Sequence, residues 1–292
     1  MFNVGKLFHL AHLVDDLDAV DHWYDEVFSC VRFYRAYEKA ALREASLLVI
    51  SDMLMEPIMP SAAPEAANSP LRKFQARFGN RLHSIAWYVD DIKACSADLG
   101  AKGIRQVGLT GKPVTDPSKA VAIWTHPKDT HALLEFCEAG FAADPRLEAN
   151  WSVQAWREHP LHIEQSSHIT CLFESVDDAA ATYGDALGGT LVETRDGPDA
   201  LRRFWAVGDG TVVEAVQPLE AGTPEGRDLA DNGEGVFALA FRTSDLAGAA
   251  TFLEEKGQRL VDRTADSFRV DLDPGFGLRL SFTDRPIGAT SN

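Results

Sequence analysis

Residues 81–92 read RLHSIAWYVDDI: a histidine opens an apolar run, and the run closes on an aspartate that can cap a helix. The same design recurs three more times, as FHLAHLVDD at 8–16, SHITCLFES at 167–175 and VFALAFRTSD at 236–245. Three copies carry a histidine at the matching place, namely His9, His83 and His168, and the fourth carries Phe237. This fourfold similarity indicates a fold built from repeated units.

Each copy opens a module that reads as a strand, a helix and three further strands. The modules cover residues 6–60, 81–140, 163–222 and 235–284. From the repeated marker to the helix-capping residue there are seven residues in modules one and three, and eight in modules two and four. The modules therefore alternate, as if a two-module domain had been copied whole. We expect one domain at 1–140, a linker at 141–162 and a second domain at 163–292.

Composition limits the classes of partner. The chain has 292 residues, of which 45% are apolar and 25% charged, as is ordinary for a globular protein. Its formal net charge of −16 repels phosphate backbones and anionic membranes, so we expect no nucleic-acid or membrane partner. A small-molecule substrate is expected instead, and a homodimer is left open.

The cellular compartment is expected to be the cytoplasm. The chain begins directly with a strand-like run, with no signal peptide, and no run approaches the roughly 20 apolar residues of a membrane helix. The four cysteines are scattered and form no Cys-x-x-Cys pair, which fits reduced thiols better than disulfides.

A second marked position lies in the last strand of each module. It holds Glu56, Glu135, Glu214 and Ser281, at 47, 52, 46 and 44 residues after the first marker. Glu56 is embedded in the apolar run MLMEPI, where a buried carboxylate is costly unless its charge is compensated. A divalent metal ion would compensate it. Two imidazoles and two carboxylates suit a six-coordinate ion better than a closed tetrahedral zinc site.

At this point the residues carry a resemblance to a known family. The four modules resemble the vicinal oxygen chelate superfamily, which includes glyoxalases, epimerases, extradiol dioxygenases and bleomycin resistance proteins. The segment THPKDTHALLE at 125–135 particularly resembles the end of an epimerase-type second module. The resemblance implies an α+β, glyoxalase-like fold in which four βαβββ modules form two cup-shaped mixed-sheet domains.

The resemblance also implies a ligand set. In that family the first strand of each module supplies a histidine and the last strand a glutamate or glutamine. Pairing modules one and two gives a complete metal set, His9, Glu56, His83 and Glu135. The carboxy-terminal cup has Phe237 and Ser281 at two of its four positions, so it is expected to have lost its metal site. Pairing modules two and three gives an alternative complete set, which stays open: His83, Glu135, His168 and Glu214.

The implied chemistry is chelation of vicinal substrate oxygens by one divalent metal ion, with Zn, Ni, Co, Mn, Fe and Mg left open. We expect a metal-dependent isomerase, epimerase or lyase that acts on a small oxygenated substrate, with Glu135 or Glu56 transferring the proton. One alternative is an extradiol-type ring-cleaving dioxygenase, although that branch places its ligands in the carboxy-terminal cup. The other is a non-catalytic, antibiotic-like binding protein.

Substrate contacts are only weakly indicated. The candidates for a substrate pocket are Trp87, Trp124, His126 and Tyr37, although core packing or a surface turn would explain several of them equally well. Arg43 and Lys128 could hold a substrate anion, but a solvated surface charge is expected for each.

Overall fold

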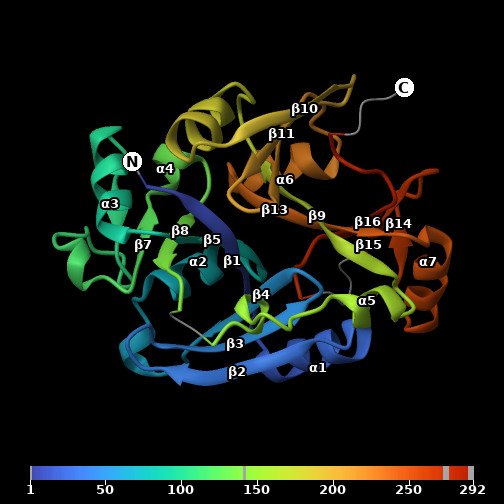
Figure 1. The fold of residues 1–292 in the computed structure, drawn as a ribbon, viewed down its shortest axis with the longest axis horizontal. Helices are drawn as coiled ribbons and strands as arrows, with labels where there is room; N and C mark the ends of the chain where they lie inside the picture. Colours follow the sequence, from blue (N-terminus) through green and yellow to red (C-terminus); the bar gives the residue numbers. More distant parts are fainter. Residues whose placement is uncertain (1, 141–142, 272–275, 289–292) are drawn as a thin grey trace.

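The computed structural model of the chain describes residues 2–140, 143–271 and 276–288. The start of the expected linker, 141–142, and two segments of the expected second domain, 272–275 and 289–292, lie outside the described residues. Two eight-stranded mixed sheets, one from each half of the chain, form the frame of the molecule (Figure 1). The expected α+β class is therefore confirmed.

The two sheets have the same internal order. The first runs β2 (Val31–Glu38), β3 (Arg43–Ile50), β4 (Met53–Pro60), β1 (Val4–Leu13), β5 (Arg81–Val89), β8 (Leu134–Glu138), β7 (Ala122–Thr125) and β6 (Gln106–Val107). The second runs β10 (Thr190–Asp196), β11 (Ala200–Val207), β12 (Thr211–Pro218), β9 (Ile163–Leu172), β13 (Gly235–Thr243), β16 (Leu280–Thr283), β15 (Ser267–Val270) and β14 (Leu260–Val261).

Helices connect the strands. The α-helices are α1 (Leu17–Phe28), α2 (Pro70–Phe78), α3 (Ile92–Ala101), α4 (Pro127–Thr130), α5 (Gln154–Glu158), α6 (Pro224–Asn232) and α7 (Leu246–Glu255). Module three has a π-helical turn, η4 (Ala180–Ala186), where the other modules have an α-helix. Short 3₁₀ turns are η1 (Pro64–Ala66), η2 (Pro117–Lys119) and η3 (Pro145–Leu147). No helix in the described part of the chain is long and apolar enough to cross a membrane.

The strand order decides which modules pair. The two modules of each sheet join through antiparallel pairing of their first strands, β1 with β5 and β9 with β13. Each first strand also pairs in parallel with the last strand of its own module. Module one thus shares a sheet with module two, and module three with module four. The alternative pairing of modules two and three is wrong, because their strands lie in different sheets.

The aspartates that close the repeated stretches cap the following helices. Asp16 accepts a hydrogen bond from Ala19 N, 2.9 Å away, and Asp245 accepts one from Gly248 N at 2.8 Å. Asp91 caps α3 in the same way. Each carboxylate satisfies an amide that the helix itself leaves unpaired, so the predicted helix starts of modules one, two and four are confirmed. The start predicted for module three is wrong, because η4 begins at Ala180 and has no side-chain cap.

One apolar core extends through both halves. Phe28 of α1 and Phe241 of β13 contact each other with their ring centroids 5.9 Å apart. The expected linker is also packed onto this core: Trp156 of α5 is buried and donates its indole N–H to the carbonyl of Phe28 at 3.1 Å. The segment is therefore part of the fold rather than a free spacer.

Candidate active site

A β-bulge in β1 aims the first predicted histidine. Phe8 and His9 lie on β1 opposite a single residue of β5, so both consecutive side chains reach the same cavity. Arg146, from the segment between the two halves, donates hydrogen bonds to the carbonyls of Leu7 and Phe8 at 3.0 and 2.6 Å. Asp144 fixes the guanidinium of Arg146 at 2.7 Å, and both side chains are buried.

A second bulge, on β5, aims the second histidine. His83 lies between Leu82 and Ser84, and β1 has no residue opposite it. His83 and Ser84 consequently line the same small cavity, with His83 Nδ1 and Ser84 Oγ 3.2 Å apart. Burial lowers the pKa of His83 to about 4, and the charge of Arg43 adds to that effect. The imidazole is therefore neutral near pH 7, the state in which histidine binds metals.

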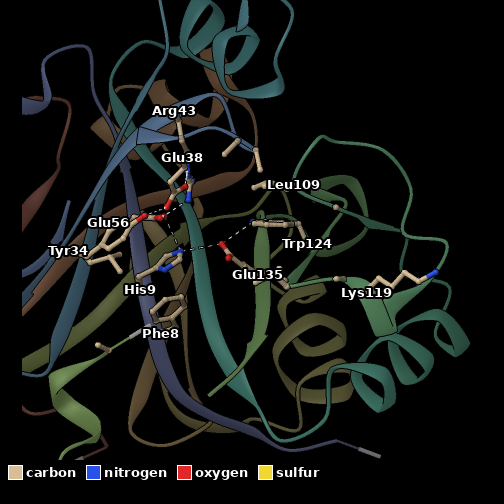
Figure 2. A pocket seen from close by; sticks show the side chains of 18 of the residues that line it. Phe8, His9, Tyr34, Glu38, Arg43, Glu56, Leu109, Lys119, Trp124 and Glu135 are labelled. Atoms are coloured by element: carbon tan, nitrogen blue, oxygen red, sulfur yellow. Dashed lines mark hydrogen bonds and ion pairs between the residues drawn. The ribbon is translucent and has the colours of Figure 1, made fainter. Parts of the chain in front are cut away.

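Three side chains from three strands converge at the inner end of a cavity of about 710 Å³ (Figure 2). Glu56 on β4 and Glu135 on β8 each place Oε2 3.2 Å from Nε2 of His9. Glu56 pairs in register with Ala11, and His9 lies two residues from Ala11 on the same face of β1. All three predicted residues are buried.

The two carboxylates have further partners. Arg43 of β3 donates from Nη2 to Glu56 Oε1 at 2.7 Å and from Nε to Glu38 Oε2 at 2.6 Å. Trp124 of β7 donates its indole N–H to Glu135 Oε2 at 2.9 Å. Arg43 is thus a partly buried partner of the site rather than a solvated surface charge. It supplies compensation for Glu56 that the sequence argument had assigned to a metal ion alone.

These contacts push the pKa values of the two glutamates in opposite directions. Burial raises the pKa of Glu56 despite the nearby charges of Arg43 and His9. Burial also acts on Glu135, but His9, Arg43 and the Trp124 N–H outweigh it and lower the pKa of that carboxyl. Burial lowers the pKa of His9, and the two carboxylates together more than offset this, so that its pKa is raised. The three groups can therefore exchange a proton among themselves.

The donor set fits a divalent ion. Metal bonds to nitrogen and oxygen are about 2.0–2.2 Å long, so neighbouring ligands of one ion lie roughly 3 Å apart, close to the separations around His9. Glu56 Oε2 is buried and makes no hydrogen bond, which leaves it available. Within residues 2–140, 143–271 and 276–288, no group of three or more His, Cys, Asp or Glu side chains is arranged so that it could hold a metal ion, so the side chains around His9 would have to shift to bind one. His83 lines the neighbouring cavity, with Glu135 on the border between the two.

Comparison with known proteins supports the fold. Residues 167–270 match the Glyoxalase/Bleomycin resistance protein/Dioxygenase superfamily. The matched residues cover most of the carboxy-terminal half, which is therefore similar to this superfamily. A mutant of 4-hydroxymandelate synthase from Streptomyces coelicolor has the same overall fold, with a TM-score of 0.69, 13% identity, and coverage of 96% of this chain and 92% of that one. The resemblance to a two-domain glyoxalase-like protein is therefore confirmed.

A second solved structure matches a smaller part of the chain. It is methylmalonyl-CoA epimerase from Mycobacterium tuberculosis, with a TM-score of 0.39, 23% identity, and coverage of 41% of this chain and 87% of that one. No curated protein sequence matches this chain.

In the carboxy-terminal half, which the family model matches, half of the site is repeated. His168 Nε2 lies 3.4 Å from Glu214 Oε2, and Arg202 donates to Glu214 Oε1 at 3.0 Å. This repeats the arrangement of His9, Glu56 and Arg43. Phe237 packs into an apolar cluster with Leu172, Ala200 and Val216, so a hydrocarbon side chain fills the register of His83. The alternative metal set is not brought together, because its two halves lie in different sheets.

Three of the four predicted pocket residues do not line either cavity. Trp87 is fully buried and stacks on Phe136, so it belongs to the core. His126 caps α4 and accepts from Lys128 N. Tyr37 lies on β2 but faces away from the cavity, which is lined instead by Tyr34, three residues earlier. Trp124 does line the cavity, as predicted.

Proposed function

We propose that the amino-terminal cup is the active site of a divalent-metal-dependent isomerase, epimerase or lyase that moves a proton on a small oxygenated substrate. The observation that carries the proposal is the convergence of two buried carboxylates on one imidazole at the inner end of a substrate-sized cavity. The pKa values of Glu56 and Glu135 are shifted in opposite directions although the two carboxyls lie close together. Such a pair suits reversible proton transfer, since one group can take up a proton while the other stays ionised.

The residues that would hold the ion are His9, Glu56, His83 and Glu135. When bound, a divalent ion supplies Lewis-acid stabilisation of negative charge on a substrate oxygen. The chain's own residues supply the rest. His83 is held neutral by burial, and the β1 bulge directs His9 into the cavity.

We assign proton transfer to Glu56. Its Oε2 has no hydrogen bond, and burial raises its pKa, which favours uptake of a proton by this carboxylate. Arg43 holds the other oxygen, Oε1, so the free oxygen is kept toward His9. Glu135 is bonded to Trp124 and has a lowered pKa, so it stays ionised and orients His9.

The test is deuterium exchange. Metal-loaded protein is incubated in D₂O with a panel of small carbon acids that carry vicinal oxygens, and loss of the proton signal is followed by NMR. We expect exchange with at least one class, and a loss of about 100-fold or more in the Glu56→Gln variant. Glu214→Gln, the matched change in the other half, should keep full exchange. Unchanged exchange in Glu56→Gln, or no exchange with any member of the panel, would contradict the proposal.

A further inference from the structure

The cavity in front of His9 is polar at its inner end and apolar along its walls. The walls come from β1, β2, β3, residues 108–109 and the strand region that leads into β7, and include Phe8, Phe33, Tyr34, Leu47, Leu109 and Val121. Trp124 adds apolar surface to these walls, because the indole N–H, the one polar group of its side chain, is already donated to Glu135. The polar atoms are concentrated around His9, Glu56 and Glu135 (Figure 2).

The cations of the cavity are already engaged. Arg43 is held by the carboxylates of Glu38 and Glu56. Lys119 is 82% exposed, lies 3.0 Å from Asp116, and extends away from the polar end in Figure 2. At the polar end of the cavity, among the described residues that line it, no lysine or arginine is therefore left to pair with a phosphate. Phosphate groups are ordinarily held by such cations or by helix N-termini.

We infer that the substrate carries an aromatic ring next to its oxygenated carbons and carries no phosphate or nucleotide group. The ring lies among the aromatic and aliphatic walls, where a π-surface gains most from contact with other rings, and the oxygens reach His9, Glu56 and Glu135. This inference rests on the proposed function for the oxygenated end only. The preference for a ring comes from the walls and does not require the metal ion.

The test is equilibrium binding of matched probes by titration calorimetry, with metal-free and with metal-loaded full-length protein. The probes are 1-phenyl-1,2-ethanediol, 1,2-propanediol and glycerol 3-phosphate, which differ in the group attached to two vicinal oxygens. We expect the phenyl diol to bind about tenfold or more tightly than 1,2-propanediol in both forms of the protein, because a buried ring removes a large apolar area from water. Glycerol 3-phosphate should bind no more tightly than 1,2-propanediol.

Two tyrosines on β2 provide a matched pair of variants. Tyr34→Ala should lower the preference for the phenyl diol several-fold, because Tyr34 lines the cavity. Tyr37→Ala should leave it unchanged, because Tyr37 projects from the other side of the same strand, and both side chains are exposed enough for the fold to tolerate the change.

Equal affinity for the two diols, including binding by neither, would overturn the inference, as would tighter binding of glycerol 3-phosphate. A ring preference in metal-free protein that persists when deuterium exchange fails would count against the proposed function alone. Exchange without a ring preference would count against the substrate class alone.

Discussion

His9 and His168 occupy the same register in the two halves and have the same neighbours, a glutamate and an arginine on adjacent strands. Their pKa values nevertheless move in opposite directions. Burial dominates at His168 and lowers its pKa, whereas at His9 the two carboxylates, Glu56 and Glu135, together outweigh burial and raise the pKa. Glu135 in β8, where β16 has Ser281, gives His9 a second carboxylate neighbour that His168 lacks.

Arg43 provides the first prediction. Arg43→Met leaves the buried carboxylate of Glu56 without its cation, so the metal-free protein should lose on the order of 2–3 kcal/mol of unfolding free energy. This loss is smaller than that expected on breaking a fully buried ion pair, because the Arg43 side chain is partly exposed. The loss should shrink when a divalent metal is added, because a bound cation replaces the missing charge. Urea denaturation with and without metal measures both effects. Arg202→Met should cost a similar amount and show no rescue by metal, and equal rescue of the two variants would refute the distinction between the halves.

His12 provides the second prediction. Its Nδ1 accepts from the hydroxyl of Tyr24 at 3.0 Å and its Nε2 donates to the carbonyl of Phe276 at 2.9 Å, and burial lowers its pKa to about 4. A depressed pKa contributes stability that is present above pH 6.5 and is lost as the pH falls toward 4, on the order of 3 kcal/mol in full. The stability difference between the native protein and His12→Asn should therefore narrow over that window in denaturation curves. A constant difference from pH 7 to pH 4.5 would contradict this account, and His22→Asn, an exposed position, serves as the control.

The histidine and glutamate positions of the site could be predicted because each module has two repeated positions, one in its first strand and one in its last strand. Arg43 could not, since one arginine in a strand is indistinguishable from a surface charge. A signal was present nonetheless: Arg43 precedes Glu56 by 13 residues, and Arg202 precedes Glu214 by 12. Which tyrosine of β2 faces the cavity could not be predicted, because the face that a residue of β2 presents depends on a register shift that the apolar pattern does not record.

At the scale of elements, the modules and most of the helix caps were predictable. An apolar run that ends in aspartate indicates both a strand and the start of the helix that follows it. The bulges were not predictable. One extra residue changes the side on which His9 and His83 emerge but leaves the apolar runs looking continuous. The same limit applies to the segment 141–162, whose length suggested a linker although its Arg146 anchors the bulge of β1.

Arg146 yields the element-scale prediction. Arg146→Met would leave Asp144 buried without its partner and the carbonyls of Leu7 and Phe8 without their donor. We expect a loss of about 3–5 kcal/mol of unfolding free energy. We also expect faster amide exchange in β1 around His9 than in β9 around His168, since only the first bulge has lost its anchor. Hydrogen-exchange mass spectrometry measures the second effect, and uniform loosening of both strands would argue against a specific anchor.

Over the whole molecule, charge and packing join the two halves. Asp228 of α6 is buried between Arg81 of β5 and Arg279, at 2.9 and 3.1 Å. Asp52 accepts two hydrogen bonds from Ser166 of β9. With an apolar core that also spans both halves, neither half buries its own surface completely.

We therefore predict a single thermal transition in scanning calorimetry, with equal calorimetric and van't Hoff enthalpies. Asp228→Ala should lower its midpoint because it leaves the buried Arg81 and the partly buried Arg279 without their carboxylate. Two resolved transitions in the native protein would show that the halves unfold independently.

Binding of Co²⁺ or Ni²⁺, measured by titration calorimetry on the native protein and on the pair His9→Asn and His168→Asn, tests the site most directly. The account predicts one ion per chain, with binding that strengthens as the pH rises, because a metal ion and a proton compete for His9, whose pKa is raised by the two carboxylates. Loss of a residue that only hydrogen-bonds a metal ligand typically lowers metal affinity roughly 10- to 100-fold. His9→Asn removes a ligand itself and should lower the affinity by at least that much, whereas His168→Asn should leave it unchanged. No bound ion in the native protein, or equal weakening in both variants, would contradict the account.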